Sequence, residues 1–377
     1  MRWGPQQSAG ISACTSWLRQ CDFEIRAGRR LSQPVFRLFG FAGTGKTTLA
    51  KTLAKEARSV CYAAFTGKAA LMMQRSGCYG ASTIHSLIYT VDEDAPDGAR
   101  FILNRESAAS EAGLIVIDEV SMVGPEIGAD LMSFGRPILV LGDPAQLPPV
   151  KGTGFFTEAK PDVMLTEIHR QARDNPIIDF ATLVREGGTL GLGSRGDSRV
   201  VERGTLSDEE VMDASQVLVG RNNTRRAFNA KLRRLGGFES EFPEAGDRLV
   251  CLRNDKTVKI LNGGLFDVVS LDHPRCDSRH IGLTLTSDDF PKRGPIEVKA
   301  LRECFTGGVE DMDWRDLKGT QVFDYGYALT VHKAQGSQWP DVVIYDESRM
   351  FREDARRWLY TALTRASERV TVVLDRR

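Results

Sequence analysis

The sequence lacks several features that would place a protein in a class at once. It contains no C-x-x-C pair, and its seven cysteines are an odd number, which argues against a zinc site and a secreted disulfide framework. No apolar run is long enough to span a membrane, and the N-terminus has no signal-peptide pattern. We therefore expect reduced thiols and a cytoplasmic location.

An excess of charge of one sign is also absent. Lys plus Arg and Asp plus Glu each number 50, so a polyanionic partner would have to meet local basic patches. Internal repeats and low-complexity tracts are absent as well. With 377 residues, the chain exceeds the usual size of one hydrophobic core and predicts two or more domains.

What the chain does contain is a regular alternation of short apolar runs with helical stretches. Near-continuous apolar strands separated by helices are typical of parallel sheets that are covered on both faces. The pattern therefore predicts an α/β fold. The strand-like runs are residues 35–41, 59–65, 114–119, 138–143, 216–220, 342–347 and 370–374.

Three segments depart from this alternation. Residues 87–106 carry the turn signal Pro96-Asp97-Gly98 between two strand-like arms, which predicts a β-hairpin. Residues 246–303 read as several short strands separated by Gly, Pro, Asn and Asp, which indicates a small inserted β-barrel. The basic run 221–234 is expected to form an exposed helix face, because charge runs are usually solvated.

The stretch "GFAGTGKT", residues 40–47, fits the phosphate-loop pattern G-x-x-x-x-G-K-[ST]. It follows a strand and opens a helix, so its backbone N–H groups can wrap phosphates at the positive end of that helix. Lys46 would reach the β- and γ-phosphates, and the Thr47 hydroxyl would bind Mg²⁺. The predicted nucleotide-binding residues are Gly43, Thr44, Gly45, Lys46, Thr47 and Thr48.

Two further buried strands end in polar residues that complete a nucleoside triphosphate site. In "LIVIDEVSM", Asp118 would hold Mg²⁺ and Glu119 would orient and deprotonate the attacking water. In "LVLGDPAQLPPV", Gln146 lies at a strand's carboxyl end, where its amide can sense the γ-phosphate. These stretches predict ATP and Mg²⁺ as cofactors and a phosphate-loop NTPase as the class.

In this order, the stretches resemble the superfamily 1 helicases, and most closely their RecD-like branch. Residues 165–178, "LTEIHRQARDNPII", resemble motif IV of that family. Residues 331–337, "VHKAQGS", resemble motif V, and residues 360–367, "YTALTRAS", resemble motif VI. The resemblance spans nearly the whole chain and implies two RecA-like domains that bind ATP in the cleft between them.

The resemblance also implies roles for residues outside the phosphate loop. Arg170 and Arg365 would reach the γ-phosphate from the second domain, where a guanidinium stabilises the charge of the transition state. Gln6 would read adenine, with Gln7 as the alternative, and Gly336 of motif V would belong to the nucleotide site. Gln338 stands where many relatives carry a glutamate, which leaves selectivity for the nucleotide sugar open.

A second Gly-Lys stretch, "AAFTGKAA", has no hydroxyl after its lysine and resembles a strand-binding motif instead. The resemblance implies that nucleic-acid phosphates bind Thr66, Gly67, Lys68, His85 of "TIHS", and Thr330, His332 and Lys333 of motif V. Phe65 replaces a common proline, and its ring would either pack beneath the strand track or stack on a base. Tyr89 or Phe101 of the hairpin would either stack at the fork or fill the packed face of the hairpin, and packing is the expectation.

The expected layout follows the same family. Residues 1–160 would form the first RecA-like domain, with a strand-separating pin at residues 87–106. Residues 161–244 and 322–377 would form the second RecA-like domain, and residues 245–321 an inserted SH3-like β-barrel. The implied activity is ATP-dependent unwinding of DNA with 5′–3′ movement on single strands.

Two other activities are compatible with the same motifs. One is an ATPase that remodels nucleoprotein without efficient unwinding, and the other is a DNA-binding module with a decayed ATPase. The expected partners are single-stranded and forked DNA, together with single-strand-binding, replication or recombination proteins. The expected setting is the cytoplasm of a bacterium or of a phage-infected host, in replication, repair or recombination.

Overall fold

The computed structural model describes residues 3–92, 100–149, 154–168, 175–255, 257–271, 279–307, 312, 316–317 and 319–375. The chain divides into two compact units. The first comprises Met1–Ala95, Ala99–Thr189 and Arg356–Thr364, and the second comprises Pro96–Gly98, Leu190–Ala355 and Arg365–Arg377.

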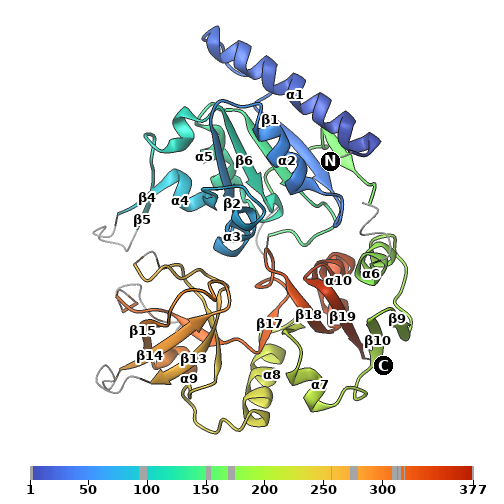
Figure 1. Ribbon diagram of the computed structural model, residues 1–377, viewed down its shortest axis with the longest axis vertical. Helices are drawn as coiled ribbons and strands as arrows, with labels where there is room; N and C mark the ends of the chain where they lie inside the picture. The colour runs from blue at the N-terminus through green and yellow to red at the C-terminus, as the bar shows by residue number, and fades with distance from the viewer. Residues whose placement is uncertain are drawn as a thin grey trace. The chain divides into compact units, whose positions relative to one another are not determined.

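The first unit is built on a parallel sheet with helices on both faces (Figure 1). Its strand order is β3-β2-β6-β7-β1-β8, and every neighbouring pair is parallel, as the apolar strand-like runs predict. The strands are β1 (Val35–Gly40), β2 (Val60–Ala64), β3 (Ser82–Thr83), β6 (Leu114–Asp118), β7 (Ile138–Gly142) and β8 (Val163–Leu165). The helices are α1 (Pro5–Arg26), α2 (Lys46–Ala54), α3 (Gly67–Arg75), α4 (Ile84–Ile88), η1 (Ala108–Glu111), η2 (Val120–Met122), α5 (Pro125–Met132), α6 (Pro176–Arg185) and α10 (Ala355–Leu363).

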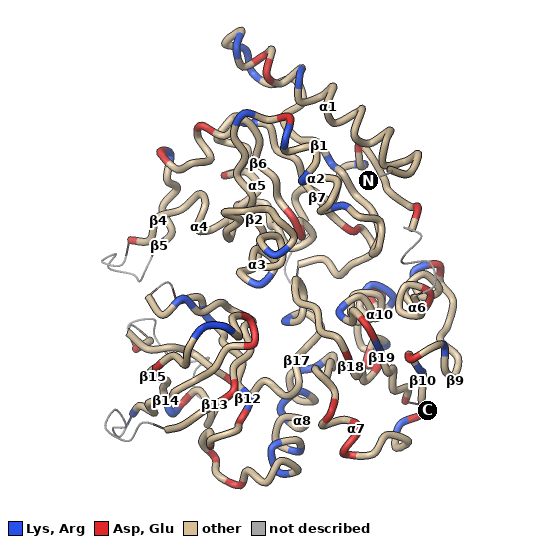
Figure 2. Tube along the Cα trace, in the orientation of Figure 1, with Lys and Arg blue, Asp and Glu red and all other residues tan. Residues whose placement is uncertain are grey.

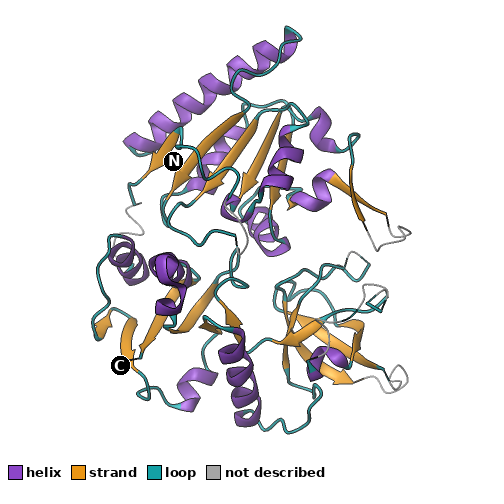
Figure 3. Ribbon diagram, turned by 180° about the vertical axis from the view of Figure 1, so that it is seen from behind, coloured by secondary structure: helices purple, strands orange, loops and turns teal. Residues whose placement is uncertain are grey.

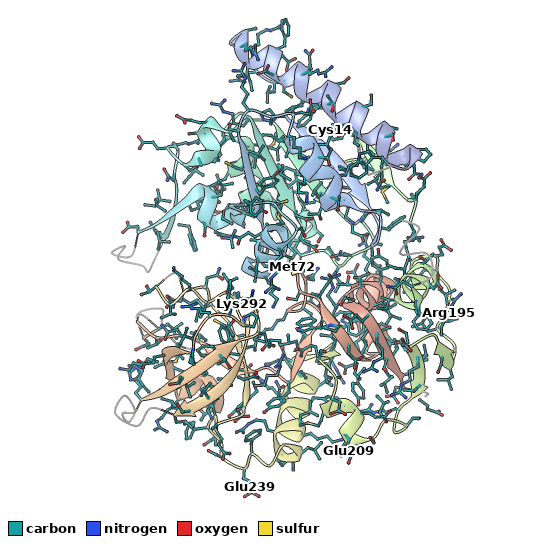
Figure 4. The ribbon with its side chains drawn as sticks, viewed as in Figure 1. Cys14, Met72, Arg195, Glu209, Glu239 and Lys292 are labelled. Atoms are coloured by element: carbon teal, nitrogen blue, oxygen red, sulfur yellow. The ribbon has the colours of Figure 1, made fainter. Side chains whose placement is uncertain are left out.

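Alternation along the central strands explains why both faces are covered. On β6, Leu114 and Val116 enter a core formed with α1, α2 and α3. Ile115 and Ile117 point the other way, into a core formed with α4 and α5. Figure 4 labels Cys14, a fully buried residue of α1 that belongs to the first of these cores. The sheet therefore has no solvated face, and its carboxyl edge is where polar residues gather.

A two-stranded antiparallel pair extends from the first unit (Figure 3). It consists of β4 (Tyr89–Asp92) and β5 (Arg100–Leu103), and the expected turn at residues 96–98 lies outside the described residues. The expected hairpin began at residue 87, but helix α4 continues to Ile88. Tyr89 packs as expected and donates a hydrogen bond to Asp130. Phe101 contacts the rings of Tyr89 and His85 but is 60% exposed, so it is packed on one side only.

The second unit contains another α/β sheet, in the order β17-β11-β18-β19-β10-β9. All its pairs are parallel except the one between β9 and β10. The strands are β9 (Gly193–Arg195), β10 (Ser198–Glu202), β11 (Gln216–Val219), β17 (Ala328–Thr330), β18 (Trp339–Tyr345) and β19 (Ala366–Leu374). The helices are α7 (Asp208–Met212), α8 (Asn222–Leu235) and η6 (Ser348–Asp354).

An antiparallel sheet interrupts this second α/β layer along the sequence. Its order is β15-β14-β13-β12-β16, and it encloses its own apolar core. Its elements are β12 (Arg248–Cys251), β13 (Leu265–Leu271), β14 (His280–Ser287), β15 (Ile296–Leu301), the short helix α9 (Glu303–Thr306) and β16 (Phe323–Tyr325). Strand β16 lies beyond both the strand-rich stretch 246–303 and the expected boundary at residue 321.

Helix α8 corrects the interpretation of the basic run 221–234. Figure 2 shows that the helix carries several Lys and Arg residues, yet Arg225 and Arg233 are buried. The Arg233 guanidinium donates to both carboxylate oxygens of Asp247, at 2.8 and 2.7 Å. Arg225 pairs with Asp324. The two arginines therefore join α8 to the residue before β12 and to strand β16, and the run is exposed only in part.

None of the helices in the described part of the chain combines the length and the apolar character that crossing a bilayer requires.

Candidate nucleotide and nucleic-acid sites

The phosphate-loop motif forms the connection between β1 and α2 in the first unit. Gly43 and Gly45 have φ of +77° and +78°, a left-handed backbone that glycine adopts without steric cost. Gly40 is needed for a different reason, because a Cβ there would lie 2.7 Å from Thr44 Oγ1 and 2.8 Å from Leu165 Cβ. The backbone thus takes the shape that turns N–H groups toward a bound phosphate.

The two functional side chains of the loop have defined partners. Lys46 Nζ donates to the carbonyl oxygens of Gly40 and Phe41, at 2.7 and 3.1 Å. These contacts hold the ammonium against the loop, within the same turn that would receive phosphate. Thr47 Oγ1 donates to Asp118 Oδ2 at 3.1 Å, which joins the loop to the end of β6.

Thr47 and Asp118 fit the requirements of Mg²⁺. A hydroxyl and a carboxylate are hard oxygen ligands, and Mg²⁺ in nucleotide sites completes its octahedron with phosphate oxygens and water. Among the described residues, no cluster of three or more His, Cys, Asp or Glu could hold a metal alone, so the oxygens of a nucleotide would have to contribute.

The environment of Asp118 favours a cationic partner. Burial raises the pKa of Asp118, while the Glu119 N–H, the Lys46 charge and the Thr47 hydroxyl act in the opposite direction. A carboxylate whose charge is penalised by burial gains most from a bound cation.

Glu119 has a strained backbone. Its φ of 54° and ψ of 46° lie in the left-handed region, which is uncommon for a residue with a side chain. Its N–H donates to Asp118 Oδ1 at 2.8 Å, and this bond helps to hold the conformation. Strain of this kind costs about 1–3 kcal/mol and is concentrated at functional sites. The sequence indicated the residue but not this conformation.

Gln146 lies in the turn after β7, at the same carboxyl edge of the sheet. Its side chain is 9% exposed, and Oε1 has no hydrogen-bond partner among the described residues. A buried acceptor without a partner costs free energy, so such atoms usually have a functional reason. An amide in this position suits recognition of a ligand that arrives with its own donor, such as an attacking water.

The two glutamines of the N-terminal segment have different partners. Gln6 Oε1 accepts the N–H groups of Thr166 and Glu167, at 2.8 and 3.1 Å, just after β8. Gln7 is buried, and its Nε2 donates to the carbonyl of Thr44 in the phosphate loop at 3.0 Å. Gln7 is therefore the glutamine that contacts the loop directly, a contact that spacing alone did not reveal.

Of the two candidate arginines, only Arg365 lies within the described residues. Arg170 lies outside the described residues. Arg365, in the second unit, is 4% exposed, and its Nη1 donates to the carbonyl of Ser337 at 3.1 Å. Gly336, beside Ser337, has a φ of +77°. The ends of motif V and motif VI are therefore in contact within the second unit.

The residues predicted to bind a nucleic-acid strand begin at the end of β2. Thr66 is the N-cap of α3, and its Oγ1 accepts the Ala69 N–H at 3.1 Å. Gly67 and Lys68 form the first turn of that helix and are buried, with Lys68 6% exposed. The positive end of α3 therefore lies within the second Gly-Lys stretch, at Thr66 to Lys68.

Both α/β sheets end their outermost parallel strand in Thr-x-His. Thr83 ends β3, which pairs with β2, and Thr330 ends β17, which pairs with β11. Each threonine Oγ1 accepts a backbone N–H three residues later, from Ser86 at 3.0 Å and from Lys333 at 3.3 Å. His85 and His332 therefore occupy equivalent positions in the two units.

The two histidines have similar surroundings. Burial lowers the pKa of both, and the charge of Asp354 partly offsets this for His332. His85 contacts the rings of Tyr89 and Phe101, and it meets Phe65 edge-on with centroids 6.1 Å apart. Phe65 is half-buried in this contact, which agrees with packing beneath the proposed track.

Comparison with known proteins assigns the family. Residues 27–205 match the AAA domain family, and residues 325–373 match the UvrD-like helicase C-terminal domain. The ATP-dependent RecD2 DNA helicase of Deinococcus radiodurans is 32% identical over 366 residues, which cover 88% of this chain and 46% of the relative. The RecD subunit of the RecBCD enzyme of Mycobacterium tuberculosis is 26% identical over 401 residues, covering 91% and 67%. The chain belongs to the RecD-like branch of superfamily 1 helicases.

Solved structures agree with this assignment at the level of the fold. A Pif1 helicase structure from a study of DNA unwinding at forked double-stranded DNA superposes with a TM-score of 0.59 at 20% identity. The superposition covers 98% of this RecD-like chain and 92% of the Pif1 chain. Bacteroides Pif1 bound to single-stranded DNA gives 0.55 at 20% identity, covering 95% and 91%. This RecD-like chain spans 46% of the length of RecD2, so the activity of that whole protein is not carried over with the family.

Several residues of the site were not found from the sequence. Tyr360 contacts the phosphate loop at Ala42 and the turn after β7 at Asp143, and Thr361 contacts that turn at Leu147. Both lie in the motif VI stretch, in which the resemblance implies a role only for Arg365. The available signal was an aromatic and a hydroxyl residue side by side within an otherwise apolar helix segment.

Proposed function

We propose that this chain is an ATP-dependent DNA helicase that moves on single-stranded DNA. The observation that carries the proposal is the convergence, at one edge of a parallel sheet, of the glycine loop, the Thr47–Asp118 pair and the buried amide of Gln146. Membership of the RecD-like family supports DNA as the polymer.

The proposed chemistry is hydrolysis of the γ-phosphate. When bound, Mg²⁺ would neutralise charge on the β- and γ-phosphates, held by Thr47 and Asp118. Lys46 would leave its loop carbonyls for the phosphates, and Glu119 would accept a proton from the attacking water. Gln146 would position that water. By resemblance, Arg170 and Arg365 would stabilise the transition state.

The first test is ATP hydrolysis with and without nucleic acid. We expect single-stranded DNA to stimulate turnover, and Lys46→Ala to lower kcat at least about a hundredfold because it removes a charge that acts on the transition state. Single-stranded RNA and duplex DNA are parallel arms that decide the polymer. Turnover that persists in Lys46→Ala would reject the assigned site, and strand binding without any turnover would indicate a decayed ATPase.

The architecture we propose for unwinding is that of the family. The two α/β sheets would be RecA-like domains, the antiparallel sheet of the second unit an SH3-like barrel, and β4–β5 a strand-separating pin. The strand track would follow Thr66–Lys68, His85 and Thr330–Lys333. The duplicated Thr-x-His position supports a track with equivalent contacts from each sheet.

The pin proposal has a specific test. Replacing residues 92–100 by Asn-Gly would shorten the hairpin but keep the pairs Tyr89↔Leu103, Thr90↔Ile102 and Val91↔Phe101. We expect unwinding of tailed forks to be lost and strand-stimulated ATPase to be retained. Unwinding at the wild-type rate would remove the pin.

The same forks also test direction and the alternative activity. Unwinding of 5′-tailed but not 3′-tailed forks is the expected polarity, which rests on resemblance. Stimulated ATPase with no unwinding of either fork would favour a translocase that remodels nucleoprotein.

A further inference from the structure

Tyr360 makes a buried bridge between two loops of the candidate ATP site. It lies on α10, in the part of that helix that belongs to the first unit, and is 1% exposed. Its hydroxyl accepts the Ala42 N–H of the phosphate loop at 2.9 Å. The same hydroxyl donates to Asp143 Oδ2 at 2.7 Å. One oxygen atom therefore ties the phosphate loop to the turn after β7.

The neighbouring residue holds the far side of that turn. Thr361 is fully buried, and its Oγ1 accepts the Leu147 N–H at 2.9 Å. Asp143 Oδ1 accepts the Ala145 N–H at 3.0 Å. Gln146 thus stands between two anchored positions, Ala145 and Leu147, and both anchors lead to consecutive residues of α10.

The phosphate loop is also held from a second direction. The Arg185 guanidinium lies 3.8 Å from the centroid of the Phe41 ring, the residue before Ala42. Cation–π contacts of a partly buried guanidinium restrain the ring beneath it. The first two residues after β1 are therefore fixed by side chains from α6 and α10, outside the loop itself.

The hydroxyl of Tyr360 remains a donor at all working pH values. Burial raises the pKa of Tyr360 far above its ordinary value, and the Asp143 charge adds to the effect. In a water-poor environment, a chain of hydrogen bonds is stronger and more directional than in water. One hydroxyl group therefore bonds both the phosphate loop and Asp143.

We infer that Tyr360 is a positioning residue for ATP hydrolysis, which sets the place of Gln146 through Asp143 and that of the phosphate loop through Ala42. The inference rests on the proposed ATPase function and adds a specific residue to it. Arg365, which is proposed to stabilise the transition state, lies five positions after Tyr360 in the sequence. Misplacement of a catalytic group by about 1 Å costs on the order of a hundredfold in rate.

The test is the variant Tyr360→Phe in the full chain. Phenylalanine keeps the ring and removes the one atom that makes both hydrogen bonds. We expect kcat of DNA-stimulated ATP hydrolysis to fall about 10- to 100-fold, with a much smaller change in KM for ATP, because the loss falls on the transition state.

Tyr327→Phe is a matched control within the second unit. The Tyr327 hydroxyl likewise accepts a backbone N–H, from Arg248 at 3.3 Å, and donates to a buried aspartate, Asp247, at 2.9 Å. Its removal should lower stability by a similar amount and leave kcat unchanged. If both variants lower kcat equally, the effect of Tyr360→Phe is general destabilisation and the inference fails.

A double-variant cycle identifies the route. If Tyr360 acts through Asp143, then Tyr360→Phe combined with Asp143→Asn will be no slower than the slower single variant. Multiplicative effects on kcat would overturn the route through Asp143. If Tyr360→Phe does not fold, Asp143→Asn alone replaces it, because it weakens the acceptor of the Tyr360 hydroxyl, and kcat should fall.

The outcomes separate this inference from the proposed function. If the wild type hydrolyses ATP and the kcat of Tyr360→Phe is within about twofold of the wild-type value, the inference is refuted and the proposed function stands. An Asp143→Asn variant with the kcat of the wild type would refute it in the same way. A wild-type chain without ATPase activity overturns both.

Discussion

Replacing Gln146 with methionine should separate stability from activity. Methionine has nearly the same length but no acceptor, and Gln146 Oε1 is buried without a partner among the described residues. Such an atom costs about 1–3 kcal/mol in the folded state. We therefore expect the free energy of unfolding without nucleotide to stay unchanged or to rise by about 1 kcal/mol, a shift in Tm of about 2–4 °C for a unit of this size.

The same replacement should impair hydrolysis. Removing one preorganised polar group from a transition-state site typically lowers kcat by about 10²–10³. The assays are urea unfolding followed by circular dichroism, and ATP turnover with saturating single-stranded DNA. A gain in stability together with a loss of activity is the expected signature of a group held for function.

Gln216 supplies the control for this experiment. Its Oε1 is also buried without a partner in the described part of the chain, but its Nε2 donates to Val217, Gly326 and Tyr327. Gln216→Met should therefore destabilise the protein and leave kcat unchanged. The reasoning would be refuted if Gln146→Met lowered stability by more than about 1 kcal/mol, or if its kcat matched that of the wild type.

Two further predictions concern the second unit. Asp247→Ala should lower the free energy of unfolding by about 3–5 kcal/mol, because it leaves Arg233 buried without its carboxylate. The double variant Asp247→Ala with Arg233→Met should lose clearly less stability. Equal losses in thermal unfolding would contradict this prediction. Burial raises the pKa of Glu347, but hydrogen bonds from Thr224, Arg221 and Gly220 outweigh it and hold the pKa below its usual value. Stability from Glu347 is therefore present above the unfolded-state pKa and lost as pH falls through the folded pKa. Glu347→Gln should flatten the decline in stability that urea unfolding shows below about pH 5, and an unchanged slope there would argue against it.

The sequence predicted those parts of the site that lie within one short stretch. The phosphate loop needs glycine at positions of positive φ, and its pattern is contiguous. Asp118 ends a buried strand and Gln146 lies in the turn after another, and parallel strands place their carboxyl ends at one edge. The placement of both residues at that edge therefore followed from the strand pattern alone.

The parts that escaped prediction join distant stretches. Tyr360 meets Ala42 and Asp143 across 318 and 217 positions of sequence, so no local pattern marks the contact. The burial of Arg233 could not be predicted, because its partner Asp247 lies beyond the end of α8, where helix spacing gives no information. The exposure of Phe101 was not predicted either, because strand alternation does not tell which side of an isolated hairpin faces solvent.

The most direct test of the account follows ATP hydrolysis and strand separation in one reaction on a 5′-tailed DNA fork. The wild-type chain and Lys46→Ala are compared at equal fork occupancy. The account predicts that the wild type hydrolyses ATP and unwinds the fork, and that Lys46→Ala does neither while still binding DNA. Fork-independent hydrolysis in the wild type, or unwinding by Lys46→Ala, would contradict it.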